Sequence, residues 1–382
     1  QIAHANLCGF GKSVIQAVLE GKVKQLVLVN CCDSARRVYD IVESTGKCNF
    51  LYMLDLPHED NECEKVKYAQ AIMRLKKAYE KFSGKTFDKE AFLNSFTENE
   101  TEMKPYIGLM GVRVTGILEK MIRDNIQMDV DNLTCTGGRQ LAVVPEQMRQ
   151  MDEEKMFLAY ADALLCQIPC FRMNNNTRRN QLYLDPNLKG IIYHTIKFCD
   201  YYGFEYASIK KNIKVPLLKI ETDFTSQSAG QLLTRIQAFA ETIEGSEDMD
   251  PGKGISEEAR KKMESGIYYV AGIDSGSTST DVVILDQDGK IKSTMIIPTG
   301  GGAMMSAEKS LDLAVEKAGI KKEEIVRIVT TGYGRAYIES GDDSITEITC
   351  HAKGAHYLNP NVRTVIDIGR ISRRSASMKM AQ

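Results

Sequence analysis

The sequence predicts an α/β fold, with parallel sheets in its first 245 residues and a differently built domain after residue 267. In the first part, short aliphatic runs alternate with segments whose apolar residues recur every three or four positions. This alternation predicts a Rossmann-like, doubly wound arrangement in which helices cover both faces of a parallel sheet. Residues 246–267 are polar, charged and glycine-containing, so we expect a linker that holds at most one short helix.

Local patterns justify each element of the first part. The aliphatic run at 23–29 predicts a buried strand, and Asp33 is expected to cap a helix that runs to about Glu43. After a strand at 49–57, a helix is predicted from one recurring apolar face, formed by Tyr68, Ile72, Leu75, Tyr79 and Phe82. Further strands are predicted at 106–111, 128–135, 190–194 and 215–223, and helices at 112–125, 197–211 and 229–243.

The part after residue 267 begins with two or three strands joined by tight turns. The segment DQDG at 286–289 supplies a hairpin turn, which makes these strands antiparallel. A helix is predicted at 306–318, and strands are predicted in the segments EIVRIVTTGYG and VRTVIDIG that follow. We therefore expect a second, mixed domain over residues 268–369.

Composition excludes several classes of protein. The chain has 382 residues, 43% of them hydrophobic and 26% charged, with a net charge of −2. This balance gives no reason to expect nucleic acid or an anionic membrane as a partner. No apolar run approaches the roughly 20 residues that span a bilayer. Ten cysteines without a secretory signal layout indicate a reducing, cytoplasmic setting, where cysteines are buried, reactive or bound to metal.

Several cysteines follow predicted strands. Cys31 and Cys32 come directly after the first strand, Cys135 ends the strand near residue 130, and Cys199 follows the strand at 190–194. Functional groups of open α/β sheets gather at the carboxyl ends of strands. The sequence therefore predicts a shared site for a soft metal, whereas Cys48 and Cys63 are expected to be structural.

Three glycine-containing turns in the second domain fit phosphate binding. In GIDSGSTSTD, small residues let the backbone approach a phosphate, and hydroxyl and N–H groups can donate to it. Asp274 is expected to hold Mg²⁺ through water. The competing interpretation is a Ser/Gly-rich hairpin turn without a ligand. The predicted phosphate and magnesium residues are Asp274, Gly276, Ser277, Thr278, Thr280, Gly332, Gly334, Asp367 and Gly369.

The order GIDSGST, TGYGR, EITCHAKGA and DIG over residues 268–369 resembles the activator (activase) proteins of 2-hydroxyacyl-CoA dehydratases. The resemblance implies the actin/hexokinase/Hsp70-like ATPase fold, with ATP and Mg²⁺ as ligands. It also implies a homodimer that shares one [4Fe–4S] cluster, for which Cys350 matches the first ligand. ATP hydrolysis in this family drives one electron onto the dehydratase at low potential.

After residue 369 the resemblance ends. The family continues DIGGQD and adds a second phosphate motif, a second ligand cysteine and an adenine pocket, whereas residues 370–382 form a basic tail without an apolar period. We expect a frameshift or a truncated reading frame here, which would leave the ATPase module incomplete and non-functional. A genuine basic tail is the alternative. The first residues, QIAHANLCGF, are expected to start inside a domain.

Residues 1–245 resemble the catalytic subunits of 2-hydroxyacyl-CoA dehydratases, a family that includes benzoyl-CoA reductase subunits and double-cubane cluster proteins. The matching segments are NLCGFGKS, NCCDSARRVYD, DNLTCTGGR, IPCFRM, IKFCDYYGFEY and IETDFTSQSAGQLLTRIQAF. The resemblance implies a [4Fe–4S] cluster held by Cys8, Cys32 and Cys199. Cys135 and Cys170 lie in other family motifs and are expected beside these ligands or in place of one.

The resemblance further implies a lyase that dehydrates a 2-hydroxyacyl-CoA to the enoyl-CoA through a ketyl radical. Implied partners are an acyl-CoA thioester, a second dehydratase subunit or a homodimer, and a low-potential donor such as ferredoxin or flavodoxin. Two alternatives stay open: a double-cubane reductase of a small molecule without CoA, and an accessory electron-transfer subunit without catalysis of its own. The acyl group, the oligomeric state and the catalytic residues stay undetermined.

Other local features have plainer explanations. NLCGFGKS ends like a phosphate-binding P-loop, but Asn6 occupies the first glycine position. The spacing of CQIPC suits zinc, but no second Cys/His pair follows. His194 is expected in the core or a pocket. Arg36 and Arg37 fit a solvated helix face slightly better than a CoA phosphate site. Glu221 and Asp223, at another strand end, fit orientation of the cluster site or substrate binding, and helix capping fits Asp223 equally.

Overall fold

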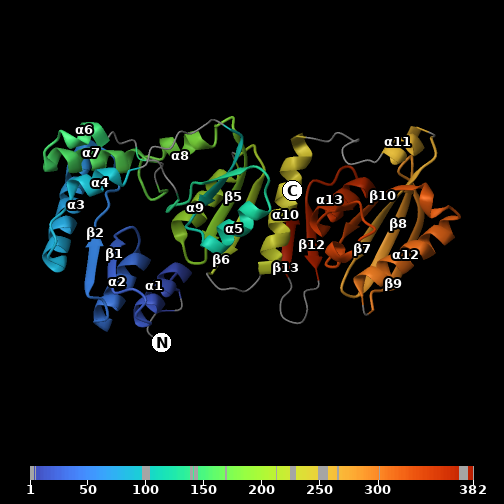
Figure 1. Ribbon diagram of the computed structural model, residues 1–382, viewed down its shortest axis with the longest axis horizontal. Coiled ribbons are helices and arrows are strands. Elements are labelled where there is room, and N and C mark those ends of the chain that lie inside the picture. Colours follow the sequence, from blue (N-terminus) through green and yellow to red (C-terminus); the bar gives the residue numbers. More distant parts are fainter. Residues whose placement is uncertain are drawn as a thin grey trace. The chain divides into compact units, whose positions relative to one another are not determined.

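A computed structural model describes residues 4, 6–96, 104–137, 141, 145–167, 170–211, 213–223, 229–247, 257–264, 266–300, 302–369 and 377–381. The chain divides into two compact units, Gln1–Ala229 and Gly230–Gln382, and each is described by itself (Figure 1). Parallel strands with intervening helices dominate the first unit, as the sequence predicts. No helix in the part of the chain described here is long and apolar enough to cross a bilayer.

The first unit opens with a small parallel sheet of β1 (Gln25–Val29) and β2 (Phe50–Leu54). Helices α1 (Gly9–Leu19) and α2 (Asp33–Thr45) pack together beside it, around a core that includes Ile15, Val38 and Val42. The cap of α2 is Cys32, and Asp33 is the first helical residue, so the predicted cap was wrong by one position. An acidic residue is favourable both at the cap and in the first turn, so the pattern does not separate the two positions.

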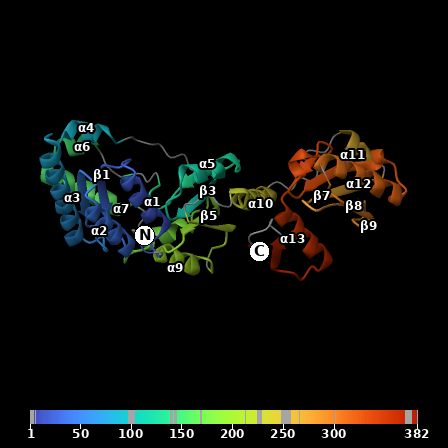
Figure 2. The same cartoon turned by 90° about the horizontal axis from the view of Figure 1, so that it is seen from below.

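A helical layer follows β2. Helix α3 (Glu62–Ser83) carries the predicted apolar face and packs side by side with α7 (Glu153–Cys166), as Figure 2 also shows. The short helices α4 (Lys89–Asn94) and α6 (Pro145–Arg149) join them through a second cluster of Phe, Met and Tyr side chains. The sequence did not predict α7, although its apolar residues supply part of both cores.

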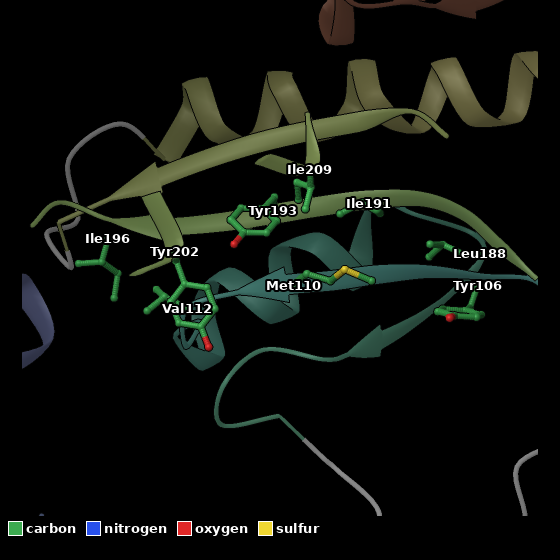
Figure 3. Packing of buried hydrophobic residues seen from close by; sticks show 9 residues of the cluster. All are labelled: Tyr106, Met110, Val112, Leu188, Ile191, Tyr193, Ile196, Tyr202 and Ile209. Atoms are coloured by element: carbon green, nitrogen blue, oxygen red, sulfur yellow. The ribbon is translucent and has the colours of Figure 1, made fainter. Parts of the chain in front are cut away.

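The second sheet of this unit is parallel, with the order β4-β3-β5-β6. Its strands are β3 (Tyr106–Gly111), β4 (Asp129–Asn132), β5 (Leu188–Ile196) and β6 (Leu217–Thr222), and its helices are α5 (Gly116–Asp124), α8 (Thr177–Leu182) and α9 (Asp200–Ile209). Every residue of β3 is buried, and eight of nine in β5, as expected for central parallel strands. Figure 3 shows the core of this sheet, with Met110, Tyr193 and Tyr202 among its side chains.

The second unit contains a mixed sheet in the order β11-β10-β7-β8-β9. The strands β7 (Tyr269–Ser275), β8 (Ser279–Asp286) and β9 (Ile291–Pro298) are antiparallel neighbours, and β10 (Ile325–Thr331) and β11 (Asp343–Ser344) extend the sheet in parallel. The predicted hairpin turn lies between β8 and β9, and its Gly289 has a φ of +75°. Helix α12 (Ala303–Ala318) packs on β8 and β9 through Ala307, Leu311 and Ala314.

The remaining elements of this unit are α10 (Ala229–Glu247), α11 (Glu257–Glu264), the 3₁₀ turns η1 (Lys322–Glu324) and η2 (Arg335–Tyr337), α13 (Glu347–Leu358), β12 (Val365–Gly369) and β13 (Ser377–Ala381). Strands β12 and β13 pair antiparallel. Part of the predicted linker, residues 248–256, and the beginning of the predicted basic tail, residues 370–376, lie outside the described residues.

Candidate functional site

The three cysteines predicted as cluster ligands in the first unit each lie at the start of a helix. Cys8 is the N-cap of α1, and its sulfur accepts the N–H of Gly11 at 3.4 Å. Cys32 is the N-cap of α2, and Cys199 is the N-cap of α9. The unpaired N–H groups and partial positive charge of a helix N-terminus favour a thiolate over a thiol. Three separate helices thus begin directly after cysteines, and among these three caps the Cys8 side chain alone accepts a capping hydrogen bond.

The neighbours Cys31 and Cys32 differ in protonation. The Cys31 thiol lies 3.9 Å from the sulfur of Cys32 and donates a hydrogen bond to it. This bond lowers the pKa of Cys32 to about 6, and the N–H groups of Ala35 and Ser34 in the first turn of α2 lower it further. The same bond, together with burial, raises the pKa of Cys31. The pKa of Cys32 therefore lies below that of Cys31.

The other cysteines of this region surround Cys199. Burial raises the pKa of Cys199 to about 12, and the nearby sulfurs of Cys32, Cys135 and Cys8 raise it further. Phe198, between the end of β5 and the cap residue Cys199, has a φ of +69°, a conformation that is strained for an aromatic residue. Four cysteines pack against the core shown in Figure 3: Cys8, Cys135, Cys170 and Cys199.

The donor set suits an iron–sulfur cluster in its chemistry, because such clusters are held by cysteine thiolates. Cysteines after β1 and cysteines beside the β4-β3-β5-β6 sheet interact electrostatically, so they lie in one neighbourhood. Within the described ranges, however, no three side chains of His, Cys, Asp or Glu are gathered closely enough to hold a metal ion. The cysteines therefore fit the group by the chemistry of their sulfur ligands, whereas the described geometry does not gather three of them as a metal site.

The second unit contains a cavity of about 690 Å³ at the first predicted phosphate turn. Its lining includes Gly276, Ser277 and Gly334, three of the predicted phosphate residues. The sequence interpretation missed the rest of the lining, although the run TGGG before α12 could have indicated it. The lining residues are Ser275, Gly276, Ser277, Thr299, Gly302, Ala303, Met304, Met305, Tyr333, Gly334, Tyr337 and Glu339.

Close backbone approach explains two glycines of this site. A Cβ atom at Gly334 would overlap the hydroxyl of Ser275 and lie 2.8 Å from the Cβ of Ala303. A Cβ at Gly332, where φ is +84°, would overlap a carboxylate oxygen of Asp274. The TGYG turn therefore packs directly on the end of β7, beside the cavity.

Acidic groups meet at the same end of β7. Asp274 pairs in register with Asp281 of β8 and Thr331 of β10. Burial raises the pKa of Asp274, and the carboxylates of Asp281 and Glu347 raise it further, whereas His351 lowers it. The buried Ser275 Oγ and Asp281 Oδ1 have no hydrogen-bond partner among the described residues. An orphaned carboxylate oxygen suits a hydrated cation, and an orphaned hydroxyl can also donate to a phosphate group.

The remaining predicted residues of this unit lie in different places. Thr280 is buried and bonds to Thr299 and Ser306, so its hydroxyl serves the packing of α12. Thr278 is exposed, and Asp367 and Gly369 belong to β12. Cys350 lies in the first turns of α13, where burial raises its pKa.

In the first unit, His194 is buried and bonded to Val112 and Thr222, in keeping with the expected core role. Arg36 and Arg37 form ion pairs with Asp33 and Asp40 on the exposed side of α2.

Comparison with known proteins gives two family matches. The model of the 2-hydroxyglutaryl-CoA dehydratase D-component matches residues 2–106 and 96–243, and that of the BadF/BadG/BcrA/BcrD ATPase family matches residues 271–374. The activator of lactoyl-CoA dehydratase from Anaerotignum propionicum is 45% identical over 26% of this chain, and an uncharacterized protein of Methanocaldococcus jannaschii is 34% identical over 44% of it. The matched part makes up 39% of the length of each of these two relatives.

Among solved structures, component A of (R)-2-hydroxyglutaryl-CoA dehydratase from Acidaminococcus fermentans is 38% identical over 26% of this chain and 39% of that chain, with a TM-score of 0.25.

Proposed function

Because the chain belongs to the 2-hydroxyglutaryl-CoA dehydratase D-component family and carries a BadF/BadG/BcrA/BcrD-type ATPase segment, we propose that it is an iron–sulfur lyase of the 2-hydroxyacyl-CoA dehydratase type. Its substrate would be a 2-hydroxyacyl-CoA thioester and its product the enoyl-CoA. It would work in the cytoplasm of an anaerobic cell, with a second dehydratase subunit or a second copy of itself.

The observation that supports this proposal most is the placement of Cys8, Cys32 and Cys199 at three helix N-termini. These three cysteines would hold a [4Fe–4S] cluster, with Cys135 and Cys170 beside them or replacing one. A cluster bound by three thiolates has one iron without a protein ligand. Such a cluster would leave one coordination position open for a ligand other than Cys8, Cys32 and Cys199.

When bound, such a cluster supplies one low-potential electron, which turns the thioester carbonyl into a ketyl radical that expels the α-hydroxyl group and returns the electron after loss of a β-proton. The chain's own residues orient the thiolates and limit the access of water. Cys32 is held as a thiolate by Cys31 and by the start of α2. The apolar core under Cys8 and Cys199 shields one side of the site.

The second unit would bind ATP and Mg²⁺ in the cavity beside Ser275 and Gly334, with Asp274 holding the metal through water. Cys350 would contribute to a cluster shared between two copies of this unit. ATP hydrolysis would then drive an electron, supplied by a ferredoxin or flavodoxin, onto the dehydratase cluster.

Iron analysis tests the proposal first. Protein purified without oxygen should contain iron and acid-labile sulfide, and titration with 2-hydroxyacyl-CoA thioesters should change its EPR signal. Protein without iron and sulfide under these conditions would falsify the proposal. A cluster whose EPR signal ignores every thioester supports an accessory electron-transfer subunit instead.

A second candidate, a double-cubane reductase of a small molecule without CoA, is favoured by one observation. Three further cysteines lie near the proposed ligands. Cys31 interacts electrostatically with Cys32, Cys135 with Cys199, and Cys170 with Tyr202. Six thiols are more than one [4Fe–4S] cluster uses. Two results together would favour this candidate. The first unit would contain more iron and sulfide than one cluster holds, and its EPR signal would be spin-coupled.

A further inference from the structure

Three strands of the sheet β4-β3-β5-β6 are followed, at their carboxyl ends, by residues near the start of α1. Arg113 lies two residues beyond β3, Lys197 and Phe198 follow β5, and Asp223 follows β6. A Cβ atom on Gly9 of α1 would overlap the carbonyl oxygen of Asp223, so the backbone of α1 packs directly on the residue after β6. Ligands of open α/β sheets bind at the carboxyl ends of the strands. This edge is therefore the part of the first unit where a ligand is expected.

Two phenyl rings at this edge have cations beside them. The ammonium groups of Lys12 and Lys197 lie 5.9 and 5.7 Å from the ring centroid of Phe198. The guanidinium of Arg113 lies 5.5 Å from the ring centroid of Phe10, two residues before Lys12 on α1. The two ammonium groups are no farther apart than the sum of their distances to the shared ring. Positive charges from three separate segments thus gather around the start of α1.

The rings leave these charges available to an anion. A ring attracts a cation but carries no net charge to neutralise it, and the two ammonium groups lie near the limit of roughly 6 Å for such a contact. Lys197 and Arg113 have no carboxylate within ion-pair distance among the described residues, whereas both arginines of α2 form ion pairs.

Two carboxylates belong to the same segments. Asp200 lies in the first turn of α9, where the helix N-terminus favours a negative charge, and Asp223 is exposed after β6. The three cations exceed them in number, so the edge carries a positive charge. Like charges repel one another, and an anion among them reduces this repulsion.

Phe198 is unusually placed for an apolar residue. It is 43% exposed, and its φ of +69° is strained. Strained residues persist where the surrounding structure holds them, and they cluster at ligand sites. An exposed ring can stack on a planar base, while cationic groups near it bind phosphate oxygens. A base joined to phosphate groups fits this edge in both respects.

We propose that Lys12, Lys197 and Arg113 bind the phosphate groups of a CoA thioester and that Phe198 stacks on its adenine. The proposal rests on the proposed function, because it names where the substrate of that function would bind. CoA joins an adenine to a diphosphate and a 3′-phosphate, so one ligand supplies both the flat ring and the anions. Free ADP shares part of this chemistry but lacks the 3′-phosphate. No covalent bond forms or breaks at this site.

Single substitutions separate charge from stacking. Lys197→Gln and Arg113→Gln each remove an exposed charge and keep a polar side chain, and Phe198→Leu removes the ring and keeps an apolar side chain. Arg37→Gln is the matched control, since it removes an exposed charge of α2. Isothermal titration of the full chain with acetyl-CoA, 3′-dephospho-CoA and MgADP measures the three affinities.

We expect Lys197→Gln, Arg113→Gln and Phe198→Leu each to bind acetyl-CoA several-fold more weakly than the wild type, with Arg37→Gln unchanged. At least one of the two charge variants should lose less affinity for 3′-dephospho-CoA, because the phosphate that its charge would contact is absent. Wild-type affinity for acetyl-CoA in both charge variants overturns the proposal, and so does wild-type protein that does not bind acetyl-CoA. Equal losses for MgADP and acetyl-CoA in every variant would identify a free nucleotide as the ligand and overturn the assignment to CoA.

Failure of this proposal and failure of the proposed function give different results. Protein that lacks iron and sulfide but binds acetyl-CoA through Lys197 and Arg113 has this site and is not an iron–sulfur lyase. Protein whose EPR signal responds to 2-hydroxyacyl-CoA thioesters, but whose two charge variants bind acetyl-CoA normally, has the function and lacks this site. Circular dichroism identifies a variant that fails to fold, and the two charge variants, at exposed positions, then decide without Phe198→Leu.

Discussion

The pKa values of the neighbours Cys31 and Cys32 shift in opposite directions because of one hydrogen bond and one helix. The Cys31 thiol donates a hydrogen bond to Cys32, and α2 begins directly after Cys32. A thiolate at this position is ready to bind metal, whereas the thiol beside it is not. The hydrogen bond and the first turn of α2 together distinguish these two neighbours of the same residue type.

We therefore predict that Cys32→Ser loses the iron of the first unit and that Cys31→Ser keeps it. Cys63→Ser is the matched control, since Cys63 is exposed on α3. Iron and sulfide content and the visible absorbance of anaerobically purified variants measure the effect. Equal iron loss in the Cys31 and Cys32 variants would contradict the assignment.

His194 predicts a dependence of stability on pH. Burial lowers its pKa from the usual 6.5, and its two ring nitrogens are bonded to Val112 and Thr222 in the neutral form. The unfolded chain thus binds a proton on this residue more readily than the folded one, so its contribution is fully present above pH 6.5 and is lost as the pH falls below that value.

The unfolding free energy of the wild type should therefore fall between about pH 7 and pH 5 more steeply than that of His194→Gln, which has no proton to bind. Urea unfolding at a series of pH values measures this difference. Parallel curves for the two proteins would show that the folded state accepts the proton without cost.

At the scale of elements, α10 and α13 are joined by an unusual cap. Thr346 is the N-cap of α13, but its hydroxyl donates to Glu241 of α10 at 2.8 Å, and its N–H donates to the same carboxylate at 2.8 Å. Nearby, Arg335 of the TGYGR turn donates to Gln237 of α10 at 2.7 Å. The Glu241 carboxylate of α10 thus accepts hydrogen bonds at the N-terminus of α13, the helix that carries Cys350.

Glu241→Ala should destabilise the start of α13 by about 1.5–3 kcal/mol, the range for hydrogen bonds to a charged group. We expect faster hydrogen exchange at residues 346–351, with little change in α12. Glu316→Ala, on the exposed face of α12, removes a similar charge as a control. Unchanged exchange at 346–351 would mean that α13 is held by packing alone.

At the scale of the whole molecule, the two units carry separate sites, so a substitution in one site should leave ligand binding at the other unchanged. Gly334→Val places a side chain against Ser275 and Ala303, where no space exists beside the cavity. We expect MgADP binding at least about tenfold weaker, because the overlap costs more than about 1.4 kcal/mol. Isothermal titration measures this affinity, and iron bound by the first unit should be unchanged. Gly272→Val, which meets open space on β7, is the control.

Much of the fold was predictable because it follows from local patterns. The aliphatic runs became β1, β3, β5 and β6, and the DQDG segment became the β8–β9 turn. The family of the chain was also predictable, because its cysteine and glycine motifs stand in a specific order, and both family matches confirm it. Helix α7 was missed because it is buried from several sides and lacks a single apolar face.

The sequence by itself determined that this is an α/β protein with cysteines at strand ends and phosphate-type turns in its second part. Only the tertiary structure decided that Cys8, Cys32 and Cys199 are all helix caps, that α10 belongs to the second unit, and that Glu241 of α10 caps α13. Periodicity and motifs depend on near neighbours in the chain. Burial, capping by a distant side chain and charge compensation depend on residues that only folding brings together.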